Sequence, residues 1–409
     1  MVNNKILLLV LSDQHIPNFL SVKRFDPDTV YIFQTKAMQE KGVLKNFEKA
    51  LNVHPSCLSI KEIFIERDIN DIESMTYLIN KLNSIYMNNK ESEWIVNLTG
   101  GTKLISILLY QFFQDKNLKL IYMAINSNYF IDLKKKEKIG IEYKINIDEF
   151  LAGYGISITG LNTSNPQDIW KKLSIILVKN ARNNDIENFL SGIYGIKQIN
   201  DKQKKMFHEG SKLTINLNDN IQIHSNPDNI IDIITKDPFH LILKQNNITG
   251  TLSEKSALYF TGGWLEYFVA SLLYEVKDEL DLHDITKNLK IQLPNGTENE
   301  IDIAFMHNQT LHIVECKTGS QANDRSGDNT LYKMEAIKES MSAIKIKSYL
   351  VTTSFNIYNK NNISIKDNVT KRALSYDITI ISPIDIIKLA EEFNDKQQLI
   401  QNCRKIFKI

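Results

Sequence analysis

Four charged residues in the last third of the chain are spaced so that they could bind a metal ion and hydrolyse a phosphodiester bond. Glu300 and Asp302 lie two residues apart in one apolar run, and Glu315 and Lys317 lie two residues apart in the next. Side chains alternate between the two faces of a strand, so each pair shares a face. The intervening turn at 307–310 is short enough to join the two runs as a hairpin. All four charged groups would then meet at one edge of a sheet.

Carboxylates this close repel one another and raise each other's pKa, and a divalent cation removes that cost. Carboxylate oxygens suit the hard ions Mg²⁺ and Mn²⁺. Such an ion polarises a phosphoryl oxygen and activates water, and Lys317 would hold the water or stabilise charge on the phosphate. The alternative is two solvated strand faces with salt bridges. Ile313 and Val314 run directly into Glu315, and apolar residues flank Asp302, so the buried setting favours the metal site.

A second group of polar residues, near the amino terminus, could bind an anionic ligand. It comprises Ser12, Asp13 and Gln14 after the first apolar run, and Asn97, Thr99, Gly100, Gly101, Thr102 and Lys103 after a later one. Glycines allow the backbone to approach a ligand, and the following helix offers free N–H groups. In a doubly wound sheet both loops lie beyond the carboxyl ends of strands, where ligands bind. The alternative is a Gly-rich turn that Thr102 caps.

The first 150 residues alternate strand-like and helix-like patterns, which predicts a parallel sheet with helices on both faces. The predicted strands are 5–11, 29–34, 59–65, 93–97 and 119–124, the helices 36–52, 70–88 and 102–116, and a final hairpin 128–133 with 139–145. The Gly-rich stretch 153–167 is interpreted as a linker. A helix is predicted near 168–194, and Lys-rich residues 202–205 follow it.

From residue 262 onward the pattern predicts a second α/β unit around the acidic hairpin. The predicted helices are 263–277, 328–343, 363–375 and 384–394, and the strands are 287–293, 299–307, 310–317, 347–353 and 378–381. This order of elements places the charged residues inside a sheet that helices cover.

Length and composition indicate a soluble protein of more than one domain. The 409 residues exceed the roughly 250–300 that a single core sustains. We expect one domain over 1–152, a connecting region over 153–260 and a second domain over 261–409. The net charge of +1 excludes a global attraction for a polyanion. Three cysteines without metal or disulfide spacing suit the cytoplasm, and the apolar run 6–11 is too short to span a membrane.

The hairpin resembles the PD-(D/E)xK nuclease superfamily, which has a restriction-endonuclease-like fold. Asp302 matches the Asp of its motif, and Glu315-Cys316-Lys317 matches (D/E)-x-K, whereas Ile301 stands where many members have Pro. The resemblance implies catalysis by Asp302, Glu315 and Lys317, with the backbone carbonyl of Cys316 as a further metal ligand. It also implies that an acid on the preceding helix joins the metal site, and Glu266 is placed for that. The alternative for Glu266 is a first-turn acid that the helix dipole favours.

The two loops and the ECKTG run of 315–319 together resemble the CARF-domain nucleases of type III CRISPR systems. The resemblance implies a Rossmann-like CARF domain that senses a ligand, followed by the nuclease domain. It implies a homodimer that binds one cyclic oligoadenylate, most simply cyclic tetra-adenylate, across its two-fold axis. With Mn²⁺ or Mg²⁺ it would cut single-stranded RNA or DNA, or nick duplex DNA.

Two other functions stay open from the residues alone. The first is a ligand-responsive regulator that binds nucleic acid without cutting it, and the intact Asp302, Glu315 and Lys317 argue against it. The second is a constitutive repair or restriction nuclease with an unrelated α/β domain. His312 falls on the strand face opposite Glu315, and we expect it to pack in the core.

Overall fold

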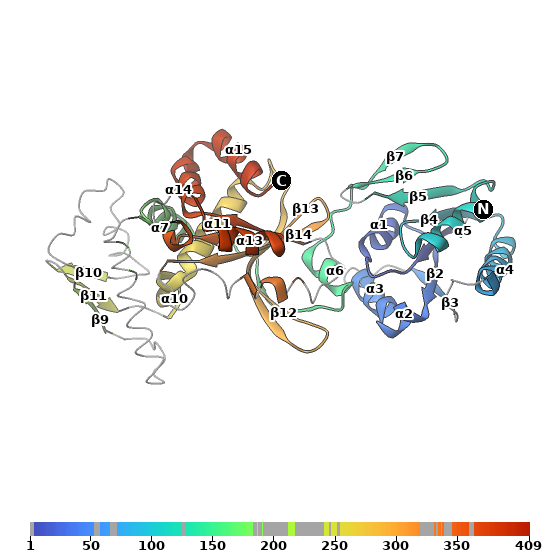
Figure 1. Ribbon diagram of the computed structural model, residues 1–409, viewed down its shortest axis with the longest axis horizontal. Coiled ribbons are helices and arrows are strands. Elements are labelled where there is room, and N and C mark those ends of the chain that lie inside the picture. Colours follow the sequence, from blue (N-terminus) through green and yellow to red (C-terminus); the bar gives the residue numbers. More distant parts are fainter. Residues whose placement is uncertain are drawn as a thin grey trace.

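The computed structural model shows two α/β domains side by side along the long axis of the molecule (Figure 1). It describes residues 4–52, 58–65, 72–124, 127–182, 212–216, 241–244, 247–251, 254–319, 346–359 and 364–409, and single positions at 186, 190, 331–332, 334–336 and 338. The predicted α/β class is confirmed, with one mixed sheet in each domain. No helix in the described ranges is long and apolar enough to cross a membrane.

The amino-terminal domain is built on a seven-stranded sheet of order β3-β2-β1-β4-β5-β6-β7. Its strands are β1 (Lys5–Val10), β2 (Thr29–Thr35), β3 (Ser59–Ile65), β4 (Glu93–Asn97), β5 (Lys119–Met123), β6 (Tyr129–Asp132) and β7 (Glu137–Gly140). The first five are parallel, and β6 and β7 form the predicted antiparallel hairpin, although β7 ends at Gly140 and not at 145. The parallel strands end at a common edge, so the loops that follow β1 and β4 are neighbours.

Helices cover both faces of this sheet. They are α1 (Ile16–Phe25), α2 (Lys36–Glu40), α3 (Val43–Asn52), α4 (Ile72–Asn88), α5 (Lys103–Phe113) and α6 (Ile147–Ala152). β1 is buried on both sides, because Leu7 and Leu9 join one hydrophobic core and Leu8 joins the other. The helix predicted over 36–52 is divided at Gly42, whose φ of +66° ends α2.

The carboxy-terminal domain has a six-stranded sheet of order β16-β15-β14-β13-β12-β8. Its strands are β8 (Ser157–Asn162), β12 (His283–Gln292), β13 (Glu298–His307), β14 (Thr310–Lys317), β15 (Ile346–Thr352) and β16 (Ile378–Ile381). The prediction that 153–167 is a linker was wrong, because β8 lies within it and pairs with the edge of β12. This pairing satisfies backbone groups of β12 that a bare edge would expose, a benefit that local sequence does not reveal.

The helices of this domain pack mainly against one large core, although Ala373 contributes to a smaller one. They are α7 (Asp168–Lys179), α10 (Glu254–Leu258), α11 (Trp264–Val276), α13 (Asp367–Ser375), α14 (Pro383–Glu391) and α15 (Lys396–Ile406). Trp170 and Leu173 of α7 are buried against α11, so the domain reaches back to residues before 261. The helix α15 was not predicted, because its mean hydropathy is low and only Leu399 and Cys403 anchor it.

Three more strands, β9 (Lys212–Asn216), β10 (Leu241–Lys244) and β11 (Asn247–Thr251), form a small antiparallel sheet. The Lys-rich residues 202–205, most of the helix predicted over 328–343 and the end of the helix predicted over 168–194 lie outside the described residues.

Candidate active site and ligand-binding loops

The hairpin of β13 and β14 brings the predicted catalytic residues together. Their register pairs Ile303 with Val314, so the next position places Asp302 opposite Glu315 on one face. Beyond the last pair, the backbone N–H of Cys316 donates to Oδ2 of Asp302 at 2.7 Å. Nζ of Lys317 lies 3.2 Å from Oε1 of Glu315. The three side chains that the motif predicted therefore converge at the carboxyl end of β14.

Glu266, in the first turn of α11, belongs to the same electrostatic cluster. Burial, then the charges of Glu315 and Glu300, raise its pKa to about 7. Burial, then the charges of Glu315 and Glu266, raise the pKa of Asp302 to about 8. A carboxylate that is costly to ionise needs a cation before it can carry its charge at neutral pH. The helix-dipole interpretation of Glu266 does not account for this coupling to the hairpin acids.

The chemistry of these donors fits a hard divalent cation. Carboxylate oxygens are the ligands that Mg²⁺ and Mn²⁺ prefer, and a bound ion would relieve the mutual repulsion of Glu266, Asp302 and Glu315. As positioned, however, no three His, Cys, Asp or Glu side chains among the described residues are grouped closely enough to hold a metal ion. Metal binding would therefore bring these side chains closer together.

Asn288 of β12 is a member of the site that the sequence did not reveal. The pairing of Lys287 with Ile303 and of Leu289 with Ile301 places it opposite Asp302. Its Nδ2 lies 3.3 Å from Oε1 of Glu300 and 3.5 Å from Oε2 of Glu266, so the amide is a donor between two acids. Its φ of +51° is a conformation that Asn tolerates better than most residues. The local sequence pattern does not predict that this strand residue lies in the acidic site.

A buried lysine, Lys287, adds positive charge beside Glu266. Only 3% of Lys287 is exposed, and its Nζ lies 4.5 Å from the centroid of the Tyr267 ring. Burial, then the charge of Lys255, lowers its pKa, and Glu266 acts in the opposite direction. The sequence pattern does not reveal this position either, because Lys287 lies in a strand of mixed polarity.

The remaining residues of the hairpin pack in the core. His312 is fully buried, stacks on Phe305 and has its Nδ1 3.0 Å from Oη of Tyr349. Burial strongly lowers its pKa, so it packs as a neutral ring, as predicted. The Cys316 side chain belongs to the core under α11, and burial raises the pKa of its thiol. A metal-ligand role for the Cys316 carbonyl stays a prediction.

The two polar loops of the amino-terminal domain meet beyond the ends of β1 and β4, as expected for neighbouring parallel strands. A Cβ on Gly100 would lie 2.0 Å from the carbonyl oxygen of Val10, so only glycine permits this approach. Gly101 has a φ of +81°, which also favours glycine. Both glycines are therefore needed to bring the second loop against the first.

Some polar side chains of these loops stabilise the loop conformation by hydrogen bonds to the backbone. Asn97 is fully buried, and its amide donates to the carbonyl oxygen of Pro17 and accepts from the N–H of Thr99. Oγ1 of Thr99 accepts from the N–H of Met123, and Oγ1 of Thr102 accepts from the N–H of Ile105 as a helix cap. The capping interpretation of Thr102 is thus confirmed, and the buried Asn97 side chain stabilises the loop by hydrogen bonds.

Other side chains of the loops face solvent. Gln14, Thr102 and Lys103 are exposed, and so is Asp13, whose carboxylate pairs with Lys41 at 2.8 Å. Ser12 is half-buried, and its Oγ donates to the carbonyl oxygen of Gln14. No carboxylate within the described residues pairs with Lys103. The surface at the end of β1 and β4 therefore offers an uncommitted ammonium group beside a helix N-terminus.

The tip of the candidate catalytic hairpin is hydrogen-bonded to the amino-terminal domain. Oε1 of Gln309 accepts from the N–H of Ile145 at 3.1 Å, and its Nε2 donates to the carbonyl oxygen of Tyr143 at 2.6 Å. Nε2 of His283 lies 3.0 Å from the carbonyl oxygen of Ile145, and the N–H of Ile147 donates to Asp284. The two domains also share one hydrophobic core. A shift at this junction would move the hairpin that carries Asp302 and Glu315.

Two family models match two separate parts of the chain. Residues 6–150 match the Card1 CARF domain, and residues 253–400 match the Card1-like endonuclease domain. The fold and the site therefore define a CARF-domain endonuclease. Within that class, the chain joins a Card1 CARF domain to a Card1-like endonuclease domain. A comparison with curated proteins gave no match.

Solved structures share the fold. Can2 from Sulfobacillus thermosulfidooxidans, in complex with cyclic tetra-adenylate, is 19% identical with a TM-score of 0.69, over 98% of this chain and 99% of that one. Protein VC1899 from Vibrio cholerae is 17% identical with a TM-score of 0.75, over 97% and 98%. A type III CRISPR defence DNA nuclease activated by cyclic oligoadenylate is 15% identical with a TM-score of 0.50, over 90% and 51%.

Proposed function

We propose that this protein is a metal-dependent endonuclease of type III CRISPR antiviral defence that a cyclic oligoadenylate activates. The observation that carries the proposal is the acidic cluster that Glu266 of α11 forms with Asp302 and Glu315 of the hairpin, beside Lys317. The tip of the same hairpin is hydrogen-bonded to the CARF domain. The substrate is a strand of RNA or DNA, cut alone or nicked within a duplex.

A Mn²⁺ or Mg²⁺ ion held by Asp302, Glu315, Glu266 and the Cys316 carbonyl would activate water and polarise the scissile phosphate. Lys317 would donate to the oxygen on which charge develops, where a preorganised donor has its largest effect. Asn288, placed between Glu266 and Glu300, would keep the Glu266 carboxylate oriented. The backbone N–H of Cys316 fixes Asp302 in the same way.

The exposed residues of the two CARF loops would form the activator site. A cyclic oligoadenylate carries phosphates, which suit Lys103 and the N-terminus of α5. Can2, with its bound cyclic tetra-adenylate, makes a four-membered ring the first candidate. A ring with two-fold symmetry would bind across the axis of a homodimer, so we expect one activator for two chains.

A cleavage assay tests the whole proposal. Labelled RNA, single-stranded DNA and supercoiled plasmid are incubated with Mn²⁺ or Mg²⁺, with and without cyclic oligoadenylates of several ring sizes. We expect cleavage that needs both metal and one ring size. Equal cleavage without any activator would indicate a constitutive nuclease, and binding without cleavage would indicate a regulator.

Reversing one charge in the activator site should weaken activator binding. Lys103→Glu places a negative charge where a phosphate approaches, and we expect the Kd to rise about 10- to 100-fold, the size of a lost charged hydrogen bond. Calorimetry measures the Kd. The matched control is Lys90→Glu, an exposed lysine just before β4 at the opposite end of the sheet. Equal affinities in the wild type and Lys103→Glu would show that the pocket lies elsewhere.

Removing the bridge at the hairpin tip should uncouple the two domains. Gln309 has a φ of +59°, so Gln309→Gly deletes the side chain and keeps the turn. Activator affinity and basal cleavage should stay unchanged, while stimulation by the activator falls about 5- to 150-fold, the range of typical coupling energies. Single-turnover rates with and without activator measure this. Full stimulation in Gln309→Gly would show that the Gln309 bridge does not contribute to the coupling between the domains.

A further inference from the structure

A small pocket opens immediately beyond the catalytic hairpin. Its volume is about 160 Å³, and the residues that matter here are Trp264, Thr318, Thr353, Ser354, Phe355 and Asn356. Thr318 follows Lys317 in the chain, and Trp264 precedes Glu266 by two residues. The N–H of Thr353 donates to the carbonyl oxygen of Lys317 at 3.1 Å. The residues that line the pocket are therefore close in the chain, or hydrogen-bonded, to the segments that carry the candidate catalytic residues.

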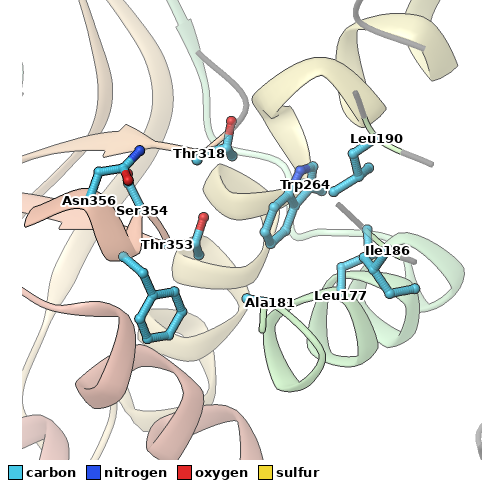
Figure 2. Close-up of a pocket in the computed structure, with 11 residues that line it drawn as sticks. Leu177, Ala181, Ile186, Leu190, Trp264, Thr318, Thr353, Ser354 and Asn356 are labelled. Atoms are coloured by element: carbon cyan, nitrogen blue, oxygen red, sulfur yellow. The ribbon is translucent and has the colours of Figure 1, made fainter. Parts of the chain in front are cut away.

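The pocket combines an aromatic wall with the polar side chains of Thr353, Ser354 and Asn356. Figure 2 shows the Trp264 ring across the pocket from Thr318 and Thr353. Trp264 is only 2% exposed and Thr353 only 6%. Within the described part of the chain, no hydrogen bond engages the indole N–H of Trp264, the hydroxyls of Thr353 and Ser354, or the amide of Asn356. Ser354 is half-buried and Asn356 is exposed, so their polar groups are accessible to a ligand that has its own polar edge.

A cation stands at the rim of this pocket. The guanidinium of Arg182 lies 4.7 Å from the centroid of the Phe355 ring. No acidic side chain in the described ranges forms an ion pair with Arg182, which is exposed. An arginine held on an aromatic ring and lacking a carboxylate is suited to a phosphate.

We propose that this pocket receives one unpaired nucleobase of the strand being cut, next to the scissile phosphate, while Arg182 contacts an adjacent backbone phosphate. A nucleobase has a flat face for the aromatic wall and a polar edge for Asn356, Ser354 and Thr353. The volume is below the roughly 300–1,000 Å³ of sites for larger ligands, so sugar and phosphate stay outside. The substrate is then a single strand or a duplex with one base turned out. This inference rests on the nuclease function proposed above.

Substrates that lack single bases test the pocket. A single-stranded oligonucleotide with one mapped cut is made with an abasic residue at each position around that cut, and cleavage rates are measured with metal and activator. We expect one position at which the abasic residue slows the wild type roughly 5- to 150-fold, the contribution of one stacked base. In Phe355→Ala the intact strand should be slowed to a similar degree, and the abasic residue should then cause little further loss.

Further variants keep the test decisive if Phe355→Ala folds poorly. Asn356→Asp alters an exposed polar edge, and we expect it to change which base is preferred at the sensitive position. Arg182→Ala should slow every strand, whereas Arg404→Ala, an exposed arginine on α15, should not. Equal sensitivity to base removal at all positions, or the same position-specific loss in Phe355→Ala and the wild type, would overturn the proposal. A wild type that cuts no strand would instead refute the nuclease function.

Discussion

Asp302→Asn is expected to abolish cleavage and at the same time to stabilise the metal-free protein. Asn keeps an oxygen that can accept from the Cys316 N–H but removes the charge that a metal ion needs. We expect cleavage to fall below detection, at least about 10³-fold, as for other losses of an essential catalytic group. Cleavage at the wild-type rate with saturating metal would show that Asp302 is not a ligand. Glu315→Gln should have the same effect on cleavage.

The stability effect follows from the direction of the pKa shift. Burial and the neighbouring Glu315 and Glu266 raise the pKa of Asp302 to about 8 in the folded protein, from an ordinary value of 3.8. The folded state therefore holds its proton more tightly, and the stability of the wild type falls as the pH rises from about 4 to about 8. Asn does not ionise, so the stability of Asp302→Asn does not fall in this way as the pH rises. Its free energy of unfolding should exceed that of the wild type by about 1–4 kcal/mol near pH 8 in a chelator.

Thermal unfolding at two pH values measures this difference. Near pH 4 the wild type and Asp302→Asn should unfold at similar temperatures, because Asp302 is protonated in the folded state and about half protonated in the unfolded state, which leaves little difference in proton binding. Added Mn²⁺ should stabilise the wild type and leave the variant unchanged, since only the wild type binds the ion. A variant that is less stable than the wild type near pH 8 would contradict the cost assigned to the buried carboxylate.

Lys317→Ala is expected to lower the cleavage rate about 10²- to 10³-fold at saturating metal and activator. Nζ of Lys317 lies 3.2 Å from Oε1 of Glu315, and the Glu315 side chain is only 4% exposed. Without metal the variant removes one positive charge beside this buried carboxylate, so it should also be less stable in a chelator. Metal should restore stability but not the cleavage rate. The ion replaces the positive charge of Lys317 beside Glu315, but it does not replace the hydrogen-bond donor that Lys317 supplies to the phosphate.

Single-turnover kinetics and thermal unfolding with and without metal separate these two roles of Lys317. The control is Lys36→Ala, which breaks an exposed i,i+4 pair with Glu40 in the amino-terminal domain and should change neither quantity by much. If metal restores both rate and stability to wild-type values, Lys317 serves only to neutralise Glu315.

The sequence by itself determined the elements whose patterns are local. Continuous apolar runs such as β1 mark strands that are buried on both faces, and period-two charges on β13 and β14 place Asp302, Glu315 and Lys317 on one side of a hairpin. Parallel strand order then requires the loops after β1 and β4 to share an edge, with glycine where the backbones approach. In these cases the physical cause acts between residues that are close in the chain, so a local sequence pattern is enough to predict the structure.

Only the tertiary structure decided the features that depend on residues distant in the chain. β8 is a strand because the edge of β12 accepts it, and α15 is a helix because the core beneath it buries Leu399 and Cys403. Asn288 enters the acidic site because the register of β12 and β13 places it opposite Asp302. Burial and charge repulsion between separate elements set the pKa of Asp302, and packing of the two domains places Gln309 at their junction. These are consequences of proximity in space, which no local pattern encodes.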